Sequence, residues 1–403
     1  MKRILLTTIL NALAIYTIAQ HKDVDRANLL LKDKNLIPAK KCIDSVLVKY
    51  PGYPRAWYLK AKIYNAIALD PQLSDKYPDI RTEAFNALKK YSDTDDKFLI
   101  DLQIDGYKPI NDIYTGYYAT AALSFNQKDY EKGYSNFVNA ISVSRFMTEK
   151  KWINMGLDTN SVLYAGVSAE KLGKMDEAAT YYSMLIEAKA KGDGFVEIYK
   201  WVANHYFDKK DYERSIRYLK IGEAVYPGDP YWPALSLDIT RETADKKQLF
   251  ARYEEIIASN PDNHLYRYNY AVELYQEGYN VDPKKRPVNS VALIDKAKES
   301  VKQAIRLQPG YSKAQLFAGQ IEYNEGIEKL KANKEEVVKK FDEPIPYFLQ
   351  VEKSLDSRGK LLVPEKEHLK EAFDLLVTIY DKKGMSDKVK EYEAKFNSVD
   401  KKH

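Results

Sequence analysis

Small and apolar residues recur along the chain at helical spacing, in short amphipathic segments separated by Pro, Gly and Asp. Ala203 is followed twelve positions later by Ser215, and then by Leu219 and Gly222, which lie on the same helical face as Ser215. Two helices can pack closely only where the side chains between them are small. The pattern therefore predicts pairs of short helices, each pair joined along a line of small residues.

The pattern repeats with a fixed period. Pro227 and Pro261 are 34 residues apart, and each is expected to end a helix because Pro cannot continue the backbone hydrogen-bond ladder. The same template fits four more segments: Ala27, Ala39, Ile43, Val46 and Pro51; Trp57, Ala61 and Tyr64; Ala121, Gly133, Phe137 and Ala140; and Gly166, Ala178, Tyr182 and Leu185. A period of this length predicts an all-α solenoid of antiparallel helix pairs.

These residues give the chain a resemblance to the tetratricopeptide repeat family, whose pattern has the same period. The resemblance extends from about Asp23 to Val399, and the chain resembles exported, periplasmic members in Gram-negative bacteria. It implies a right-handed superhelix of about eight to nine repeats. It also implies a scaffold that binds other proteins, without identifying the partner.

Several insertions interrupt the period, and the phase is lost between Tyr91 and Ile113. Insertions in a solenoid form loops on one face or lengthen a helix pair, and are places where a partner could bind. They divide the expected organisation into an N-terminal array, residues 20–263, with insertions near 70–82 and 92–113, and C-terminal units, residues 264–403, with long insertions near 278–287 and 325–340 and capping helices.

The first residues have the pattern of a signal peptide. Lys2 and Arg3 precede a mostly apolar run that ends at Ile18, with the small residue Ala19 before the expected cleavage point. The alternative is a membrane anchor, but the run is shorter than the roughly 20 apolar residues that span a bilayer. We expect residues 1–19 to be removed, the mature chain to be periplasmic or secreted, and its membrane contact to be only indirect.

Composition excludes several classes of function. The 403 residues carry a formal net charge of +5, and Lys and Arg are interleaved with Asp and Glu, so no basic stripe is available to nucleic acid. Cys42 is the only cysteine, which precludes an intramolecular disulfide. The five histidines are scattered without metal-ligand spacing, and no catalytic motif is present. We expect neither a cofactor nor an enzyme.

The first helix of each pair lines the inner curve of such a superhelix. When the small residue is counted as position 8, positions 2, 5, 9 and 12 are expected to face the groove. They include Arg55, Tyr58, Lys62, Asn65, Tyr118, Phe125, Lys200, Asn204, Tyr268 and Tyr275. Tyrosine with cations and amides suits peptide recognition. The alternatives are a solvated face and tyrosines that only fill the space between helices.

Some family members bind the C-terminal carboxylate of a partner. Lys200 and Asn204 match the first two positions of that clamp, whereas Leu235, Leu265 and Asn269 depart from the others.

The function predicted is a non-catalytic protein–protein interaction scaffold or adaptor in the cell envelope, which binds a protein segment on the concave face. One alternative is a glycan or envelope-polymer binding module, because tyrosines also stack on sugars. The other is an enzyme subunit in which the insertion at 281–287 or 70–80 forms a lid.

Overall fold

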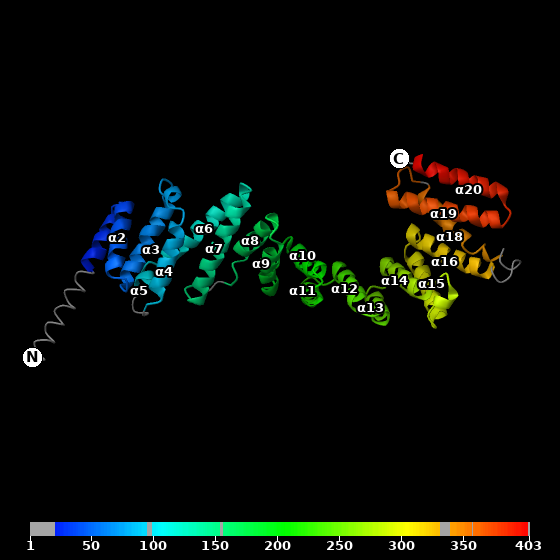
Figure 1. Cartoon of the computed structure of the whole chain (residues 1–403), viewed down its shortest axis with the longest axis horizontal. Coiled ribbons are helices and arrows are strands. Elements are labelled where there is room, and N and C mark those ends of the chain that lie inside the picture. Colours follow the sequence, from blue (N-terminus) through cyan, green and yellow to red (C-terminus); the bar gives the residue numbers. More distant parts are fainter. Residues whose placement is uncertain (1–20, 95–98, 154–155, 331–338, 357, 402–403) are drawn as a thin grey trace, which may run out of the picture. The chain divides into compact units, whose positions relative to one another are not determined.

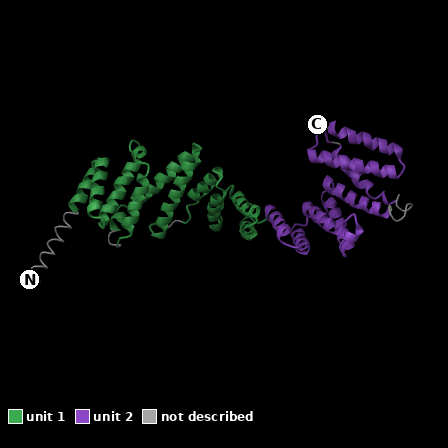
Figure 2. Cartoon of the chain, in the orientation of Figure 1, with its two compact units in different colours: residues 1–229 green, residues 230–403 purple. Residues whose placement is uncertain are grey.

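The computed structural model describes residues 21–94, 99–153, 156–330, 339–356 and 358–401, so the signal peptide predicted at 1–19 lies outside the described residues. The described residues form helices and connecting turns, without a strand. Contacts between Cα atoms divide the chain into two units, residues 1–229 and residues 230–403 (Figure 2). The boundary predicted between residues 263 and 264 lies one repeat farther along the chain. The predicted boundary is based on the repeat pattern and not on contacts between residues, and it stays a prediction.

Unit 1 consists of helix pairs that follow one another in chain order (Figure 1). The helix over residues 21–32 shares a core with α2 (Leu36–Lys49) through Val24, Ala27, Ala39 and Ile43. The later pairs are α3 (Pro54–Leu69) with α4 (Ile80–Ser92), α6 (Lys108–Asn126) with α7 (Tyr130–Glu149), α8 (Thr159–Lys171) with α9 (Met175–Glu187), and α10 (Phe195–Asp208) with α11 (Tyr212–Val225).

Unit 2 has the same organisation. Its pairs are α12 (Tyr231–Thr243) with α13 (Lys246–Ser259), α14 (His264–Gly278) with α15 (Ser290–Leu307), α16 (Ser312–Leu330) with α18 (Ile345–Leu355), and α19 (Val363–Lys382) with α20 (Ser386–Ser398). A short 3-10 helix, η4 (Val399–Lys401), follows α20. The predicted all-α arrangement of helix pairs is confirmed.

The lines of small residues lie between paired helices, as the spacing predicts. Ala203 and Ser215 are both fully buried, and the Ser215 hydroxyl donates a hydrogen bond to the Ala203 carbonyl at 2.9 Å. Gly166 faces the ring of Tyr182 so closely that a Cβ atom at this position would lie 2.5 Å from Cε1 of the ring. Small side chains therefore set how closely the two helices of a pair approach.

The Pro-containing turns separate successive pairs. Helix α11 ends at Val225 and α13 ends at Ser259, each shortly before the Pro of its turn. Gly228, directly after Pro227, has a φ of 87°, a left-handed conformation that a residue without Cβ adopts readily. The predicted helix ends at Pro227 and Pro261 are confirmed.

Short helices occupy three of the insertions. The segment between α3 and α4 contains η1 (Ser74–Lys76), and the segment between α14 and α15 contains η3 (Pro283–Lys285). The region where the repeat phase is lost contains α5 (Ile100–Ile104), a single turn whose Leu102 is fully buried in the core of unit 1. This extra turn explains the loss of phase, because it adds an element that the helix pairs do not have.

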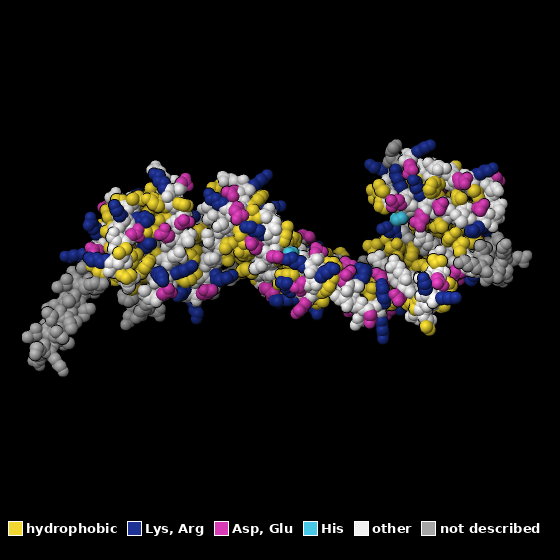
Figure 3. Space-filling model, in the orientation of Figure 1, with side chains coloured by type: hydrophobic (Ala, Val, Ile, Leu, Met, Phe, Trp, Pro, Cys, Tyr) yellow, Lys and Arg dark blue, Asp and Glu magenta, His cyan; other side chains and the backbone are white. Residues whose placement is uncertain are grey.

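None of the helices in the described parts of the chain combines the length and the apolar character that crossing a membrane requires. On the face that Figure 3 shows, Lys and Arg side chains lie interspersed with Asp and Glu over both units.

Candidate functional site

The ten predicted site residues lie on the first helices of four pairs: α3, α6 and α10 in unit 1, and α14 in unit 2. The structure brings the α3 residues together with a neighbouring insertion, and it places the α6 residues in an aromatic cluster. The α10 and α14 residues have separate surroundings.

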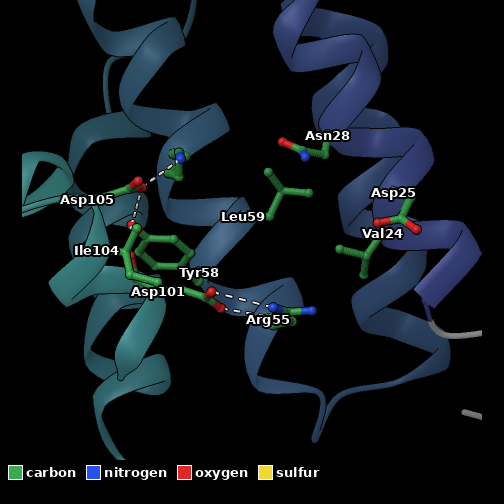
Figure 4. A pocket seen from close by; sticks show the side chains of 10 residues that line it. Val24, Asp25, Asn28, Arg55, Tyr58, Leu59, Asp101, Ile104 and Asp105 are labelled. Atoms are coloured by element: carbon green, nitrogen blue, oxygen red, sulfur yellow. Dashed lines mark hydrogen bonds and ion pairs between the residues drawn. The ribbon is translucent and has the colours of Figure 1, made fainter. Parts of the chain in front are cut away.

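Arg55, Tyr58 and Lys62 line an open pocket of about 260 Å³ between the helix at 21–32, α3 and α5 (Figure 4). The other lining residues are Val24, Asp25, Asn28, Leu59, Asp101, Ile104 and Asp105. We call this the α3–α5 pocket. The fourth α3 residue, Asn65, does not line it and is buried, 4% exposed.

Carboxylates from α5 and its C-terminal end bind both cations of the pocket. Arg55 Nε lies 3.2 Å from Asp101 Oδ2, and Lys62 Nζ lies 2.7 Å from Asp105 Oδ2. The Tyr58 hydroxyl donates to the same Asp105 oxygen at 2.5 Å. Burial opposes ionisation of Asp105, but the hydrogen bonds from Lys62 and Tyr58 outweigh it and lower the pKa of this carboxyl. The chain itself therefore satisfies the cations that were predicted to bind a partner.

Tyr118 and Phe125 on α6 are half-buried members of an aromatic cluster. The Phe125 ring meets the Tyr164 ring edge to face at a centroid distance of 5.2 Å and the Tyr130 ring at 5.5 Å. Tyr164 in turn stacks on Phe137 at 5.5 Å, and Tyr118 meets the edge of Phe137 at 5.9 Å. We call these five residues the α6–α8 aromatic patch.

The aromatic patch is accessible to solvent through Tyr164. Tyr164 is 37% exposed, whereas Phe137 beneath it is buried. Within the described residues, the hydroxyls of Tyr118 and Tyr164 have no hydrogen-bond partner. Exposed aromatic rings with available hydroxyls can offer a ligand both apolar area and a polar contact.

The α10 residues contact carboxylates of the chain, as the α3 cations do. Lys200 Nζ lies 2.9 Å from Asp229 Oδ2 and 3.1 Å from Glu197 Oε1, and the hydrogen bond to Asp229 raises the pKa of this lysine. The Asn204 amide donates to Asp208 at 2.8 Å. Lys200 therefore ties α10 to the turn that precedes Pro230.

The α14 tyrosines pack between helices of unit 2. The Tyr268 ring lies edge to face with Tyr311 at 5.3 Å and Phe317 at 6.0 Å. Tyr275 is buried, stacks on Tyr279 at 4.8 Å, and accepts a hydrogen bond from the Asn324 amide at 3.0 Å. Tyr275 therefore fits the alternative in which tyrosines only fill the space between helices, because its ring and its hydroxyl both contact other residues of the chain.

Among the residues of these surfaces that sequence reasoning missed are Asp101, Asp105 and Tyr164. Asp101 and Asp105 lie in the region where the repeat phase is lost, so the period could not place them against α3. Their spacing of four residues was the available signal, because it puts both carboxylates on one face of a helical turn. Tyr164 was missed because it occupies position 6 of its repeat, outside the positions expected to face the groove.

Within the ranges that the structure describes, no group of three or more His, Cys, Asp or Glu side chains could hold a metal ion.

The chain has only weak structural similarity to known proteins. No family model matches the chain, and no curated protein matches it. Among solved structures, the chain is similar to the C-terminal part of a tetratricopeptide repeat-containing protein from Cytophaga hutchinsonii, with 12% identity, a TM-score of 0.31 and coverage of 94% of this chain and 96% of the other.

Two further solved structures have similar values. A tetratricopeptide repeats protein from Bacteroides fragilis has 18% identity and a TM-score of 0.27, with coverage of 69% of this chain and 98% of that one. The MamA protein has 13% identity and a TM-score of 0.24, with coverage of 62% and 98%. At such scores the similarity carries no argument about function, and the all-α architecture rests on the helix pairs of the chain itself.

Proposed function

We propose that the chain is a non-catalytic protein-interaction scaffold that binds a segment of another protein through the α6–α8 aromatic patch. The observation that supports this most is the contact between the Phe125 and Tyr164 rings, which extends an aromatic surface across two successive helix pairs. Protein interfaces are enriched in aromatic residues, and buried aromatic rings often dominate their binding energy. A partner that covers Tyr164 would bury such a ring.

The charged residues of the predicted groove support binding less directly. Arg55, Lys62 and Lys200 are each paired with a carboxylate of the chain, so a partner would first have to replace an existing ion pair. The aromatic patch has no such competition, because covering it removes apolar area from water without breaking an internal contact.

Photocrosslinking tests this function. A photoreactive residue at position 164, in cells that make the protein, is expected to crosslink one protein, and the control at the exposed Lys390 of α20 is not. Phe125→Ala in the crosslinking variant is expected to reduce the product at least fivefold. Equal products from both positions, or polysaccharide instead of protein attached at position 164, would contradict the proposal.

We also propose that this scaffold works in the periplasm or outside the cell. The basis is the basic and apolar sequence of residues 1–19. Cell fractionation followed by N-terminal sequencing tests this directly. The expected mature chain begins at about Gln20 in the periplasmic or secreted fraction, and an intact Met1 in the cytoplasmic fraction would contradict export.

A further inference from the structure

In the α3–α5 pocket, the cations Arg55 and Lys62 already bind two carboxylates of the chain. Asp101 and Asp105 are four residues apart, one helical turn, and both carboxylates point toward α3 (Figure 4). Arg55 and Lys62 are seven residues apart on α3, two turns along the same face. Two carboxylates one helical turn apart thus form ion pairs with two cations on another helix.

The match is completed by Tyr58, which lies between the two cations in sequence. Its hydroxyl donates to Asp105, and Lys62 Nζ lies 5.5 Å from the centre of its ring. Tyr58 is thereby held in place as a hydrogen-bond donor directed at the carboxylate position. Arg55, Tyr58 and Lys62, all on one face of α3, together bind the two carboxylates, and Tyr58 is buried between them and the core.

The pocket beside this face has room for a further side chain. Its volume is about 260 Å³, and Val24, Leu59 and Ile104 supply apolar surface. Ile104 is 75% exposed, although the neighbouring Leu102 is fully buried. In Figure 4 the Asn28 side chain extends from the helix at 21–32 toward α3, where its amide can meet a polar group of a ligand.

Exchange of carboxylates in this pocket requires little rearrangement. The side chains of Arg55 and Lys62 are 51% and 35% exposed, and ion pairs accessible to water contribute little to stability. Buried Leu102 anchors α5 in the core of unit 1. The side chains of Asp101 and Asp105 are themselves 24% and 32% exposed, so a carboxylate from solvent can approach the same two cations.

From these observations we infer that the α3–α5 pocket is a second interaction surface, specific for an acidic helical segment of a partner protein that presents two carboxylates one turn apart. Asp101 and Asp105 act as built-in competitors for the same cations, so they lower the affinity for such a segment. The inference rests on the proposed function as a protein-interaction scaffold, but it uses a surface separate from the aromatic patch.

Fluorescence anisotropy with a defined probe tests the inference on the full chain. The probe is a labelled alanine- and glutamine-rich helical peptide with two aspartates four residues apart, and its twin carries two asparagines. The variant D101N/D105N is expected to bind the diaspartate peptide at least tenfold more tightly than the wild-type chain does. Adding R55Q and K62Q should remove this gain. The diasparagine twin should bind neither protein.

Two further variants control for general charge and for folding. Asp112 pairs with Lys108 on the adjacent α6, so D112N removes a nearby carboxylate without freeing the α3 cations and should leave binding unchanged. The single variant D105N keeps the Arg55–Asp101 pair and is expected to give an intermediate gain, about threefold. Circular dichroism melting establishes that each variant is folded.

The inference is overturned if folded D101N/D105N and D105N both bind the diaspartate peptide no more tightly than the wild type does. It is also overturned if D112N gives the same gain. Crosslinking from position 164 separates this failure from that of the scaffold function, because it depends on the aromatic patch alone. If crosslinking is retained but no variant binds the peptide, only the inference about the α3–α5 pocket is refuted. If both are lost, the proposed scaffold function is refuted as well.

Discussion

The hydroxyl of Tyr64 on α3 donates a hydrogen bond of 2.5 Å to the carboxylate of Asp44 on α2, and thereby joins two successive helix pairs. Lys60 Nζ lies over the Tyr64 ring, 4.4 Å from its centre, and 3.2 Å from the same Asp44 oxygen. The combination of tyrosine, carboxylate and lysine recurs where Tyr270 donates to Glu254 at 2.6 Å beside Lys296. In both places the tyrosine joins two successive helix pairs of the chain.

Tyr64→Phe is expected to lower the free energy of unfolding by about 1 to 2 kcal/mol, since the half-buried Asp44 carboxylate loses one donor but keeps its lysines. Urea unfolding followed by circular dichroism measures this. Tyr164→Phe is the matched control, because within the described residues the Tyr164 hydroxyl has no partner. Equal losses in the two variants would show that the Tyr64–Asp44 hydrogen bond does not stabilise the fold.

Acid is expected to destabilise unit 2 through Glu325 on α16. Burial opposes its ionisation, but the hydrogen bond from Lys298 and the charges of Lys298 and Lys340 lower the pKa of Glu325 to about 2. A carboxyl whose pKa is lower in the folded than in the unfolded state stabilises the fold at pH values above about 4.5. This contribution is lost as the pH falls from about 4.5 toward 2.

Glu325→Gln isolates this contribution. The variant should be less stable than the wild type at pH 7, and the difference in melting temperature between them should shrink at pH 3. Glu242→Gln, at an exposed glutamate of α12 in unit 2 that has no ion pair within the described ranges, should differ from the wild type equally at pH 7 and pH 3. A difference for Glu325→Gln that is the same at pH 7 and pH 3 would contradict the pKa shift as its cause.

Alkaline pH is expected to destabilise the chain through its buried and half-buried tyrosines. Burial raises the pKa of Tyr91, Tyr114, Tyr199 and Tyr311 to about 12, compared with about 10 in an unfolded chain. The folded state therefore holds these protons more tightly, so its stability is full below pH 10 and falls between pH 10 and 12.

The melting temperature should accordingly stay level from pH 7 to about 9.5 and fall above pH 10. Phenolate absorbance should rise at higher pH in the native chain than in urea. If the native and the urea-unfolded chain gave the same titration curve, burial would not be raising the pKa of these tyrosines.

The periodic features of the fold could be predicted from the sequence, because helix pairing depends on local spacing. Ala203 and Ser215 meet because they are small and occupy equivalent levels of two paired helices. The position of Arg55 on the first helix of its pair followed from the same spacing. That Asp101 binds it could not be predicted, because this contact depends on how an irregular insertion packs on α3. Tertiary contacts, not repeat position, thus decide which groove residues remain available to a partner.

The close approach of paired helices gives the most specific test of the repeat alignment. A Cβ atom at Gly166 would lie 2.5 Å from Tyr182 Cε1 and 2.7 Å from Cδ1, and the Tyr182 ring is buried and cannot move aside freely. Gly166→Ala is therefore expected to cost about 1 to 3 kcal/mol in the free energy of unfolding, the range for overpacking. Urea unfolding provides the measurement.

Gly133→Ala is the matched control, because Gly133 also lies on a helix of a pair, α7, but a Cβ atom there would lie 3.4 Å from its nearest neighbour, the Phe125 backbone nitrogen. Alanine at this position fits in ordinary van der Waals contact and is favoured over glycine within a helix by about 0.5 to 1 kcal/mol. The two substitutions should consequently change stability in opposite directions. Destabilisation by both to the same degree would mean that the contact with Tyr182 does not set the helix separation in this pair.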